Sequence, residues 1–320
     1  MASTRDVQRR IKSVNNTKKI TRAMEMEAAV KMRRAVEAVL RTRTYANLSW
    51  ETVLNLSKSM NGNGMHPLLS KRGKVEKIGI ILITSNRGLC GGFNTAIINK
   101  VNDSIKKYHF QGEKAVIEAE FVLVGKKGAA IRLHGHEIVA DFPKLDLAAE
   151  VNEIVPVAKM IIGDFLSGKY DKVMVAYTDF VSASKQVPRV KQILPVDIEA
   201  HDEFLGVVGK DTRVGVTQEF LEEKHEKHMS NKYVYEYTFE PSPREVLDEM
   251  IPRLIEVQLY QALLESNASE QSARMAAMHQ ATEAATDMVK ELTLFYNKAR
   301  QASITAEIAE ISAGANALAE

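Results

Sequence analysis

The sequence predicts an α/β plus coiled-coil protein, in which the two ends of the chain form a long antiparallel pair of helices around a central α/β domain. Three observations indicate this fold class. Residues 3–58 contain neither proline nor glycine, and residues 77–197 alternate short β-branched runs with helical stretches. From Ser242 to about Gly314, apolar residues recur in steps of three and four. With 320 residues the chain is long enough to bury a full core.

The first segment, residues 1–59, is predicted to be one continuous helix of good helix formers, about 85 Å long. Its apolar stripe is interrupted by Lys18 and Thr21. A cluster of turn formers at 61–67 ends the segment. The stripe follows helical spacing and therefore needs a partner surface; it consists of Val7, Ile11, Val14, Met24, Ala28, Met32, Ala35 and Val39.

The central segment, residues 76–240, is predicted to be a Rossmann-like α/β domain with a partly parallel sheet. Helices are expected at 94–108 and 148–166, between the strands. A polar insertion near 201–232 precedes a further expected strand at 233–240. The expected strands before the insertion lie at 77–85, 119–125, 136–142, 172–180 and, as a possible fifth, 189–197.

The last segment, residues 242–320, is predicted to be a second long helix that Ser242 caps and Pro243 begins. Pro252 is expected to kink it or mark a bend. Thirteen of the sixteen positions on its seam are apolar, which is coiled-coil patterning. A lone helix cannot bury such a seam, so we expect it to pack antiparallel against the first helix. The seam positions are Leu247, Met250, Leu254, Val257, Gln261, Leu264, Ala268, Gln271, Met275, Met278, Thr282, Ala285, Val289, Leu292, Tyr296 and Ala299.

Charge is distributed unevenly along the chain, although the net formal charge is only +2. Residues 1–43 carry twelve Lys or Arg against four acidic residues, a net of +8, while residues 301–320 carry three Glu and no basic residue. One hypothesis is a nucleic-acid-binding helix. The basic residues are spread around the helix without interleaved aromatics, and the apolar stripe needs a helical partner. We therefore predict no nucleic-acid partner, and a solvated basic face remains the ordinary alternative.

The stretch ILITSNRGLCGGFN, residues 81–94, raises the alternative of an α/β enzyme with a phosphate-binding loop. Its glycines are spaced G-x-x-G-G and no Walker lysine follows. We interpret it as a structural turn that needs glycine for backbone freedom, and we predict no catalytic residue and no cofactor.

Metal, membrane and disulfide signals are weak. His225 and His228 are spaced by three but lack a full zinc pattern, so no metal site is predicted. The apolar run at 78–83 is too short to span a bilayer, and no leader sequence is expected. Cys90 is the single cysteine, so no intramolecular disulfide is expected.

Three blocks of sequence carry a resemblance to a known family. These are residues 11–35, SNRGLCGGFNTAII at 85–98, and residues 265–315, which end in the pattern I-T-x-E-x-x-E-x-x-x-G-A at 304–315. In these blocks, and over essentially its whole length, the chain resembles the gamma subunit of F-type ATP synthase. It departs from the family at Glu283 and Ala284, where Asp-Asn is frequent. It also lacks the second cysteine that thiol regulation requires.

The resemblance implies a rotary central shaft with no nucleotide site of its own. Its expected partners are the ring of alpha and beta subunits, the epsilon subunit and the c-ring of Fo. The complex would place it at the cytoplasmic face of a bacterial cell membrane. The residues implied in partner contact and coupling are Met24, Glu270, Arg274, Gln301, Thr305 and Glu307. On physical grounds alone, helix packing is the better explanation of Met24.

Overall fold

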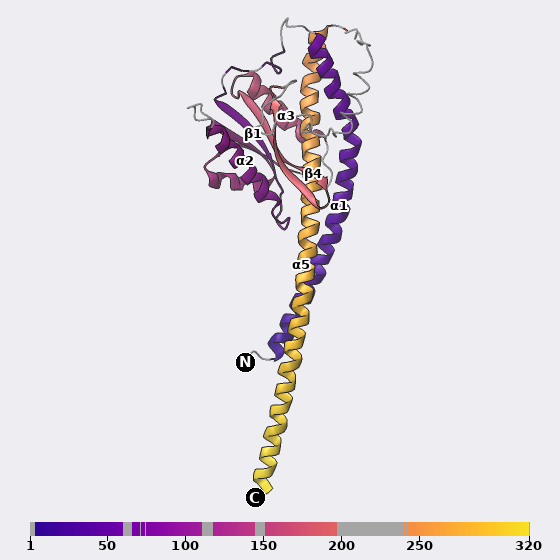
Figure 1. Ribbon diagram of the computed structural model, residues 1–320, viewed down its shortest axis with the longest axis vertical. Helices are drawn as coiled ribbons and strands as arrows, with labels where there is room; N and C mark the ends of the chain where they lie inside the picture. The colour runs from indigo at the N-terminus through magenta and orange to yellow at the C-terminus, as the bar shows by residue number, and fades with distance from the viewer. Residues whose placement is uncertain are drawn as a thin grey trace. The chain divides into compact units, whose positions relative to one another are not determined.

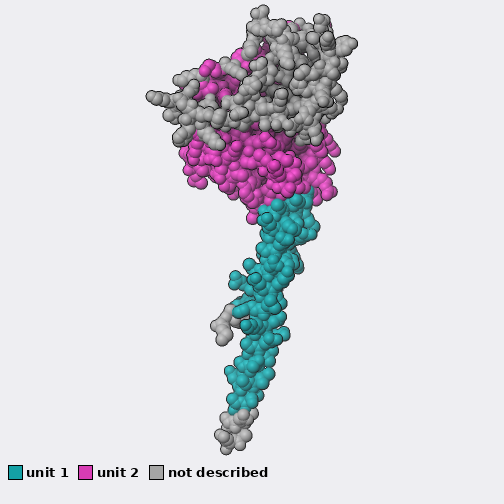
Figure 2. All heavy atoms as spheres, in the orientation of Figure 1, with its two compact units in different colours: residues 1–29, 274–320 teal, residues 30–273 magenta. Residues whose placement is uncertain are grey.

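A computed structural model of the chain describes residues 4–59, 66–70, 72–73, 75–110, 118–144, 151–196, 240 and 242–319. The polar insertion, the strand expected from residue 233, and the pair His225 and His228 lie outside the described residues. The chain forms two compact units. Unit 1 comprises residues 1–29 and 274–320, and unit 2 comprises residues 30–273 (Figure 2).

Two long helices begin and end the described chain, as predicted. Helix α1 spans Thr4–Ser59 and helix α5 spans Pro243–Ala319 (Figure 1). At 1.5 Å per residue they are about 84 and 115 Å long. Helix α5 continues through Pro252 and past Gly314. Ser242 caps its start, because the Ser242 hydroxyl accepts the Glu245 N–H at 3.3 Å and donates to the Glu245 carboxylate at 3.0 Å.

The centre of unit 2 is a five-stranded sheet in the order β3-β2-β1-β4-β5. The pairs β1–β2, β2–β3 and β1–β4 are parallel, whereas β4 and β5 form an antiparallel hairpin. The predicted partly parallel sheet is confirmed, including the fifth strand, which begins four residues earlier than expected. The strands are β1 Lys77–Ile83, β2 Glu118–Val124, β3 Glu137–Phe142, β4 Lys172–Ser182 and β5 Lys185–Leu194.

Helices cover both faces of this sheet. Helix α2, Phe93–Phe110, and a 3-10 helix that the sequence did not reveal, η1, Lys126–His134, pack on one face (Figure 1). Helix α3, Val151–Leu166, and the first part of α5 pack on the other. Six of the seven residues of β1 are buried, as expected for a central parallel strand covered on both sides.

Asp171 fixes the amino-terminal edge of the sheet. Its carboxylate accepts the backbone N–H groups of Glu76 and Lys77 at 2.9 and 3.0 Å, and the Arg72 guanidinium lies 3.2 Å away. Burial by itself would raise the pKa of Asp171, but the two backbone donors and the guanidinium outweigh it and lower that pKa. The ionised carboxylate therefore ties the start of β1 to the start of β4.

The predicted helical seams are confirmed by burial in each unit. All sixteen seam positions of α5 are buried or half-buried, including the four from Val289 to Ala299, whose immediate neighbours are exposed. On α1, the predicted stripe is likewise buried or half-buried, and Lys18 and Thr21 lie half-buried on the same face. Beyond Arg300 the pattern stops, because residues 301–313 are all exposed.

Candidate functional site

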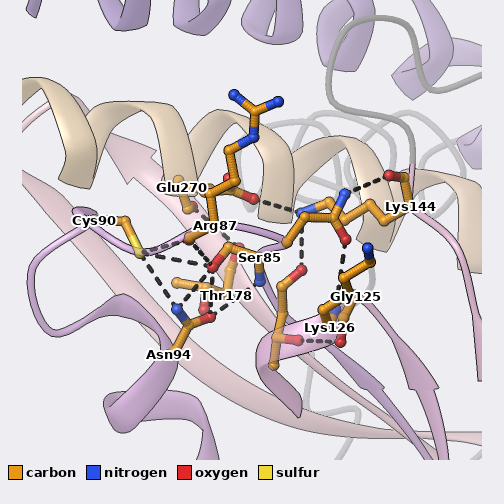
Figure 3. Close-up of polar contacts among 12 residues, drawn as sticks. Ser85, Arg87, Cys90, Asn94, Gly125, Lys126, Lys144, Thr178 and Glu270 are labelled. Atoms are coloured by element: carbon orange, nitrogen blue, oxygen red, sulfur yellow. Dashed lines mark hydrogen bonds and ion pairs between the residues drawn. The ribbon is translucent and has the colours of Figure 1, made fainter. Parts of the chain in front are cut away.

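The glycine-rich turn between β1 and α2 is closed by its own side chains. The Asn94 amide oxygen accepts the Ser85 backbone N–H at 3.0 Å, and the Asn94 amide nitrogen donates to the Ser85 hydroxyl at 2.7 Å (Figure 3). That hydroxyl donates in turn to the Arg87 carbonyl at 2.7 Å. Cys90 is buried beside them, with the Asn94 amide 3.3 Å from its sulfur. These contacts support the interpretation of the turn as structural.

The carboxyl ends of β1 and β4 meet where the strand order of the sheet reverses. In open α/β folds, this is the edge at which ligands bind. The pairing of Leu82 with Ala176 sets Thr84 and Thr178 level with each other, two residues further along their strands. In this chain the edge is occupied by polar side chains of α5.

Three α5 residues bond to this edge, and we call the assembly the α5 clamp. Ser269 donates to the Thr178 carbonyl at 3.1 Å, and Ser272 donates to the Ala183 carbonyl at 2.6 Å. Glu270 pairs with the Lys144 ammonium at 2.6 Å. The Gln186 side-chain amide donates to the Ser272 hydroxyl at 3.1 Å. The clamp comprises Ser269, Glu270 and Ser272 of α5, the side chains of Lys144 and Gln186, and the carbonyls of Thr84, Thr178 and Ala183.

Lys144 is the hub of the α5 clamp. Its ammonium also donates to the Thr84 carbonyl at 3.1 Å, so one cation joins the end of β1 to α5 (Figure 3). Its own carbonyl accepts the Asn86 side-chain amide. The side chains of Lys144 and Glu270 are 0% and 3% exposed. Because a buried charge needs a close counter-charge and further hydrogen bonds, this pair depends on its geometry.

Gly125 supports the strand end that carries the clamp. Its φ is 110°, and its carbonyl accepts the Thr84 hydroxyl at 2.9 Å. A Cβ at this position would lie 2.4 Å from the Thr84 carbonyl oxygen. Only glycine allows this close approach of the two strand ends.

A second buried polar group in unit 2 joins α1, α5 and the sheet. Thr42 donates to the Gln261 amide oxygen at 2.6 Å, and the Gln261 amide nitrogen lies 3.4 Å from the Glu265 carboxylate. Burial lowers the pKa of Lys191 on β5 to about 8, although the negative charge of Glu265 acts to raise it. Burial also raises the pKa of Tyr177, over whose ring the Lys191 ammonium lies at 5.6 Å.

In unit 1, α1 and α5 also pair through polar residues at the seam and beside it. Thr282 donates to the Thr21 hydroxyl at 2.8 Å, and one nitrogen of His279 lies 3.1 Å from the Glu25 carboxylate. As residue numbers rise along α1 they fall along α5, so the pairing within this unit is antiparallel. Polar seam positions of this kind fix the register of a coiled coil.

The six predicted coupling residues lie in different surroundings. Met24 is half-buried on the α1 stripe, and Arg274 is half-buried on α5. Glu270 is buried in the clamp. Gln301, Thr305 and Glu307 are exposed, and the Thr305 hydroxyl donates to the Gln301 carbonyl at 2.9 Å. Their contacts with partner subunits stay predictions.

Sequence reasoning missed the partners that hold Glu270. Nothing in the sequence links Lys144 to a helix more than a hundred residues further along. One signal was available, because Gln261 and Thr282 interrupt the apolar seam. Gln261 accepts a hydrogen bond from α1, and Thr282 donates one to α1. Polar residues at seam positions therefore indicated hydrogen bonds to α1, but nothing indicated the bonds that Ser269, Glu270 and Ser272 make to the sheet edge.

Among the described residues, no group of three or more His, Cys, Asp or Glu is arranged to hold a metal ion. Within the same part of the chain, no helix combines the length and apolar character needed to cross a membrane.

The paired helices and the α/β module define a helical-shaft protein whose sheet edge is bonded to its own helix. The family model for ATP synthase matches residues 3–318. The ATP synthase gamma chain of Herpetosiphon aurantiacus is 40% identical over 325 aligned positions, covering 99% of each chain. The chain belongs to the ATP synthase gamma chain family.

Solved structures share the fold. A chain of the central stalk and c-ring structure of Tetrahymena thermophila mitochondrial ATP synthase aligns with a TM-score of 0.54 at 21% identity, covering 82% of this chain and 99% of that one. A chain of the Euglena gracilis mitochondrial ATP synthase, in a structure of OSCP, F1 and c-ring, aligns with a TM-score of 0.62 at 17% identity, covering 98% and 94%.

Proposed function

We propose that this chain is the central shaft of a rotary ATP synthase, and that it couples ion flow through the membrane rotor ring to conformational change in the catalytic beta subunits. The observation that carries the proposal is the continuous seam of α5, buried or half-buried at every position up to Ala299. Paired long helices resist bending and twisting better than loops do. The chain itself is a non-catalytic subunit, and the nucleotide chemistry belongs to its neighbours.

The end of α5 has the surface expected of a shaft tip. Residues 301–313 are exposed and rich in small side chains, with one stripe of exposed apolar residues at Ile304, Ile308 and Ile311. Steps of four and three place these three residues on one face. We infer that the ring of alpha and beta subunits surrounds this tip, while the epsilon subunit and the c-ring contact other parts of the chain.

The coupling residues act in two ways under this proposal. We assign Met24, Arg274, Gln301, Thr305 and Glu307 to direct contacts with the beta subunits, since each of them keeps exposed surface for such a contact. Glu270 acts from inside the chain, since its carboxylate is engaged by Lys144. The exposed basic residues of α1 form weak contacts with acidic loops of the ring, worth about 0–1 kcal/mol each, which exchange easily during rotation.

The proposed location is the cytoplasmic face of a bacterial cell membrane. The chain reaches the membrane through its complex, as a peripheral subunit. Protease protection in right-side-out and inverted vesicles tests this location, and cleavage only in inverted vesicles is the expected result.

Co-purification is the first test of the function. The tagged full chain is expressed with its native operon partners, and we expect alpha and beta subunits to be recovered with it in a fixed ratio, the tagged chain being the minor component. Recovery of the chain without alpha and beta would contradict the proposal.

Arg274→Ala tests the direct contacts. Loss of one shaft contact should weaken the transmission of torque while the catalytic sites stay intact. ATP-driven ion pumping in membrane vesicles is therefore expected to fall more than ATP hydrolysis. Lys290→Ala is the matched control, because Lys290 is 70% exposed and pairs only with Asp287 of its own helix among the contacts of the described residues. Equal loss of pumping and hydrolysis in Arg274→Ala would count against the assignment.

A further inference from the structure

The α5 clamp lies where the apolar contacts between α5 and the sheet come to an end. The α5 residues that pack into the core on this face of the sheet run from Leu247 to Leu263. From Glu265 to Ser272 most of the buried α5 residues are polar. The helix is therefore held to the sheet first by apolar packing and then, over its next turns, by hydrogen bonds and an ion pair.

Polar bonds constrain the helix in a way that apolar packing does not. Hydrophobic contacts are non-directional and tolerate small rotations, whereas hydrogen bonds weaken steeply when their angles change. At 100° per residue, Ser272, Ser269 and Glu270 cover an arc of about 160° around α5. Each bonds to a different point of the sheet edge, so rotation of α5 about its own axis would break several bonds at once.

The ion pair of the clamp is almost completely shielded from water. Lys144 and Glu270 are 0% and 3% exposed, whereas the surface pair Lys77 and Glu118 is 51% and 63% exposed. An exposed pair exchanges with water at little cost. Removing one partner of a buried pair leaves an uncompensated charge and is strongly unfavourable. The clamp therefore keeps its geometry when α5 is twisted against the sheet, whereas surface pairs on the same module exchange their partner for water.

We propose that the α5 clamp is the torsional joint through which the α/β module and α5 turn together, and that Lys144 and Glu270 are its positioning residues. The proposal rests on the proposed shaft function. Torque that enters at the α/β module has to pass into α5, and the clamp fixes the rotational setting of α5 on the sheet edge where comparable folds bind their ligands. In this chain that edge binds α5 instead of a ligand.

The test measures torsional stiffness in the assembled enzyme. The alpha and beta ring is immobilised, and a bead is attached through Leu133→Cys, because Leu133 is 88% exposed on η1 of the α/β module. The width of the bead's angular fluctuations during pauses in rotation reports the compliance between ring and module. In Lys144→Met, which removes the charge but keeps an apolar stem, we expect this width to grow by about twofold. ATP-driven pumping falls by more than half, while ATP hydrolysis by the detached F1 sector stays near the level of the unmodified enzyme.

Matched variants separate the joint from general stability. Lys77→Met makes the same substitution in an exposed pair at the opposite end of β1, and it should leave width and pumping unchanged. Glu270→Gln keeps the shape and one acceptor oxygen, so an intermediate width is expected. If Lys144→Met does not assemble, the same angular width and pumping are measured in Glu270→Gln and Ser272→Ala instead.

The outcome that overturns the joint is an assembled clamp variant with the same angular width and the same ratio of pumping to hydrolysis as Lys77→Met. Failure of the unmodified chain to assemble with alpha and beta subunits would instead contradict the shaft function. The two failures are thus distinguishable.

Discussion

Replacing Gly125 by alanine tests whether the strand ends under the α5 clamp require the close approach seen in the structure. The added Cβ would lie 2.4 Å from the carbonyl oxygen and 2.9 Å from the carbonyl carbon of Thr84. Thr84 cannot retreat freely, because its N–H donates to the Val124 carbonyl at 2.9 Å and its carbonyl accepts Lys144. The backbone itself must move.

Two costs add in this variant. A side chain at φ 110° strains the backbone by about 1–3 kcal/mol. Relieving an overlap with a neighbouring backbone costs about 1–3 kcal/mol more. We therefore expect the free energy of opening this edge to fall by about 4 kcal/mol, which is a large part of the 5–15 kcal/mol typical of a domain.

Cys90 provides the assay, because it is the only cysteine of the chain, is 2% exposed, and lies in the turn that follows Thr84. Its rate of labelling by a thiol reagent under native conditions reports the population of the opened edge. A loss of 4 kcal/mol corresponds to about a thousandfold faster labelling.

Two glycines serve as controls for this experiment. Gly135→Ala has a φ of 83° but no atom within 4 Å of the new Cβ, so it carries backbone strain without overlap and should accelerate labelling by about tenfold. Gly88→Ala has neither feature and lies close to Cys90, so it should change the rate by less than about threefold. If Gly125→Ala labels no faster than Gly135→Ala, the close approach of the two strand ends does not require glycine.

Three further predictions concern stability. Asp171→Asn should lower the free energy of unfolding by about 1–2 kcal/mol at neutral pH. The pKa of Asp171 in the folded chain is lowered from 3.8, so the carboxylate loses its stabilising charge as pH falls through this lowered pKa. Urea unfolding of the two proteins should show the difference in stability vanish over that pH range. The folded pKa of Lys191 is lowered from 10.5 to about 8, so unfolding takes up a proton between these two pH values. The stability of the unmodified chain relative to Lys191→Met should therefore rise by up to about 3 kcal/mol from pH 8 to 10.5. A stability difference that does not change with pH over this range would refute the prediction. Thr282→Val should weaken the helix pair of unit 1 by about 1 kcal/mol, seen as faster amide hydrogen exchange near Thr21, and unchanged exchange there would contradict the role of this hydrogen bond.

The long helices and the sheet were predictable because their signals are local and periodic. The absence of glycine and proline in residues 3–58 and the steps of three and four after Ser242 specify helices wherever they pack. Strand β1 is a continuous apolar run between turn formers, as a buried parallel strand requires. The 3-10 helix η1 escaped prediction because its sequence, KKGAAIRLH, has no apolar periodicity and depends on contacts with α2 and β2.

The candidate site was predictable only in part, because its decisive contacts are distant in sequence. Glu270 was expected to be functional through family resemblance, but its burial and its partner follow from tertiary packing. Lys144 and Glu270 are separated by 126 positions, and Ser269 and the Thr178 carbonyl by 91. Composition and spacing contain no information about such pairs. A carbonyl acceptor, moreover, leaves no signature in a side-chain sequence at all.

Exposed and buried charges have different roles in this chain, because some contacts must exchange during rotation and others must stay fixed. Contacts that must exchange in every rotation are best made by exposed groups, whose pairing with water costs little, and the exposed basic residues of α1 meet that condition. A contact that must keep a fixed geometry needs groups that water cannot replace, and the buried pair of Lys144 and Glu270 meets this second condition. An apolar substitute of equal volume would pack as well, but it would not set the angle of α5 on the sheet. On this argument the ion pair contributes rotational specificity more than stability, so a variant with both residues apolar should fold and assemble yet still show the wider angular fluctuations of Lys144→Met.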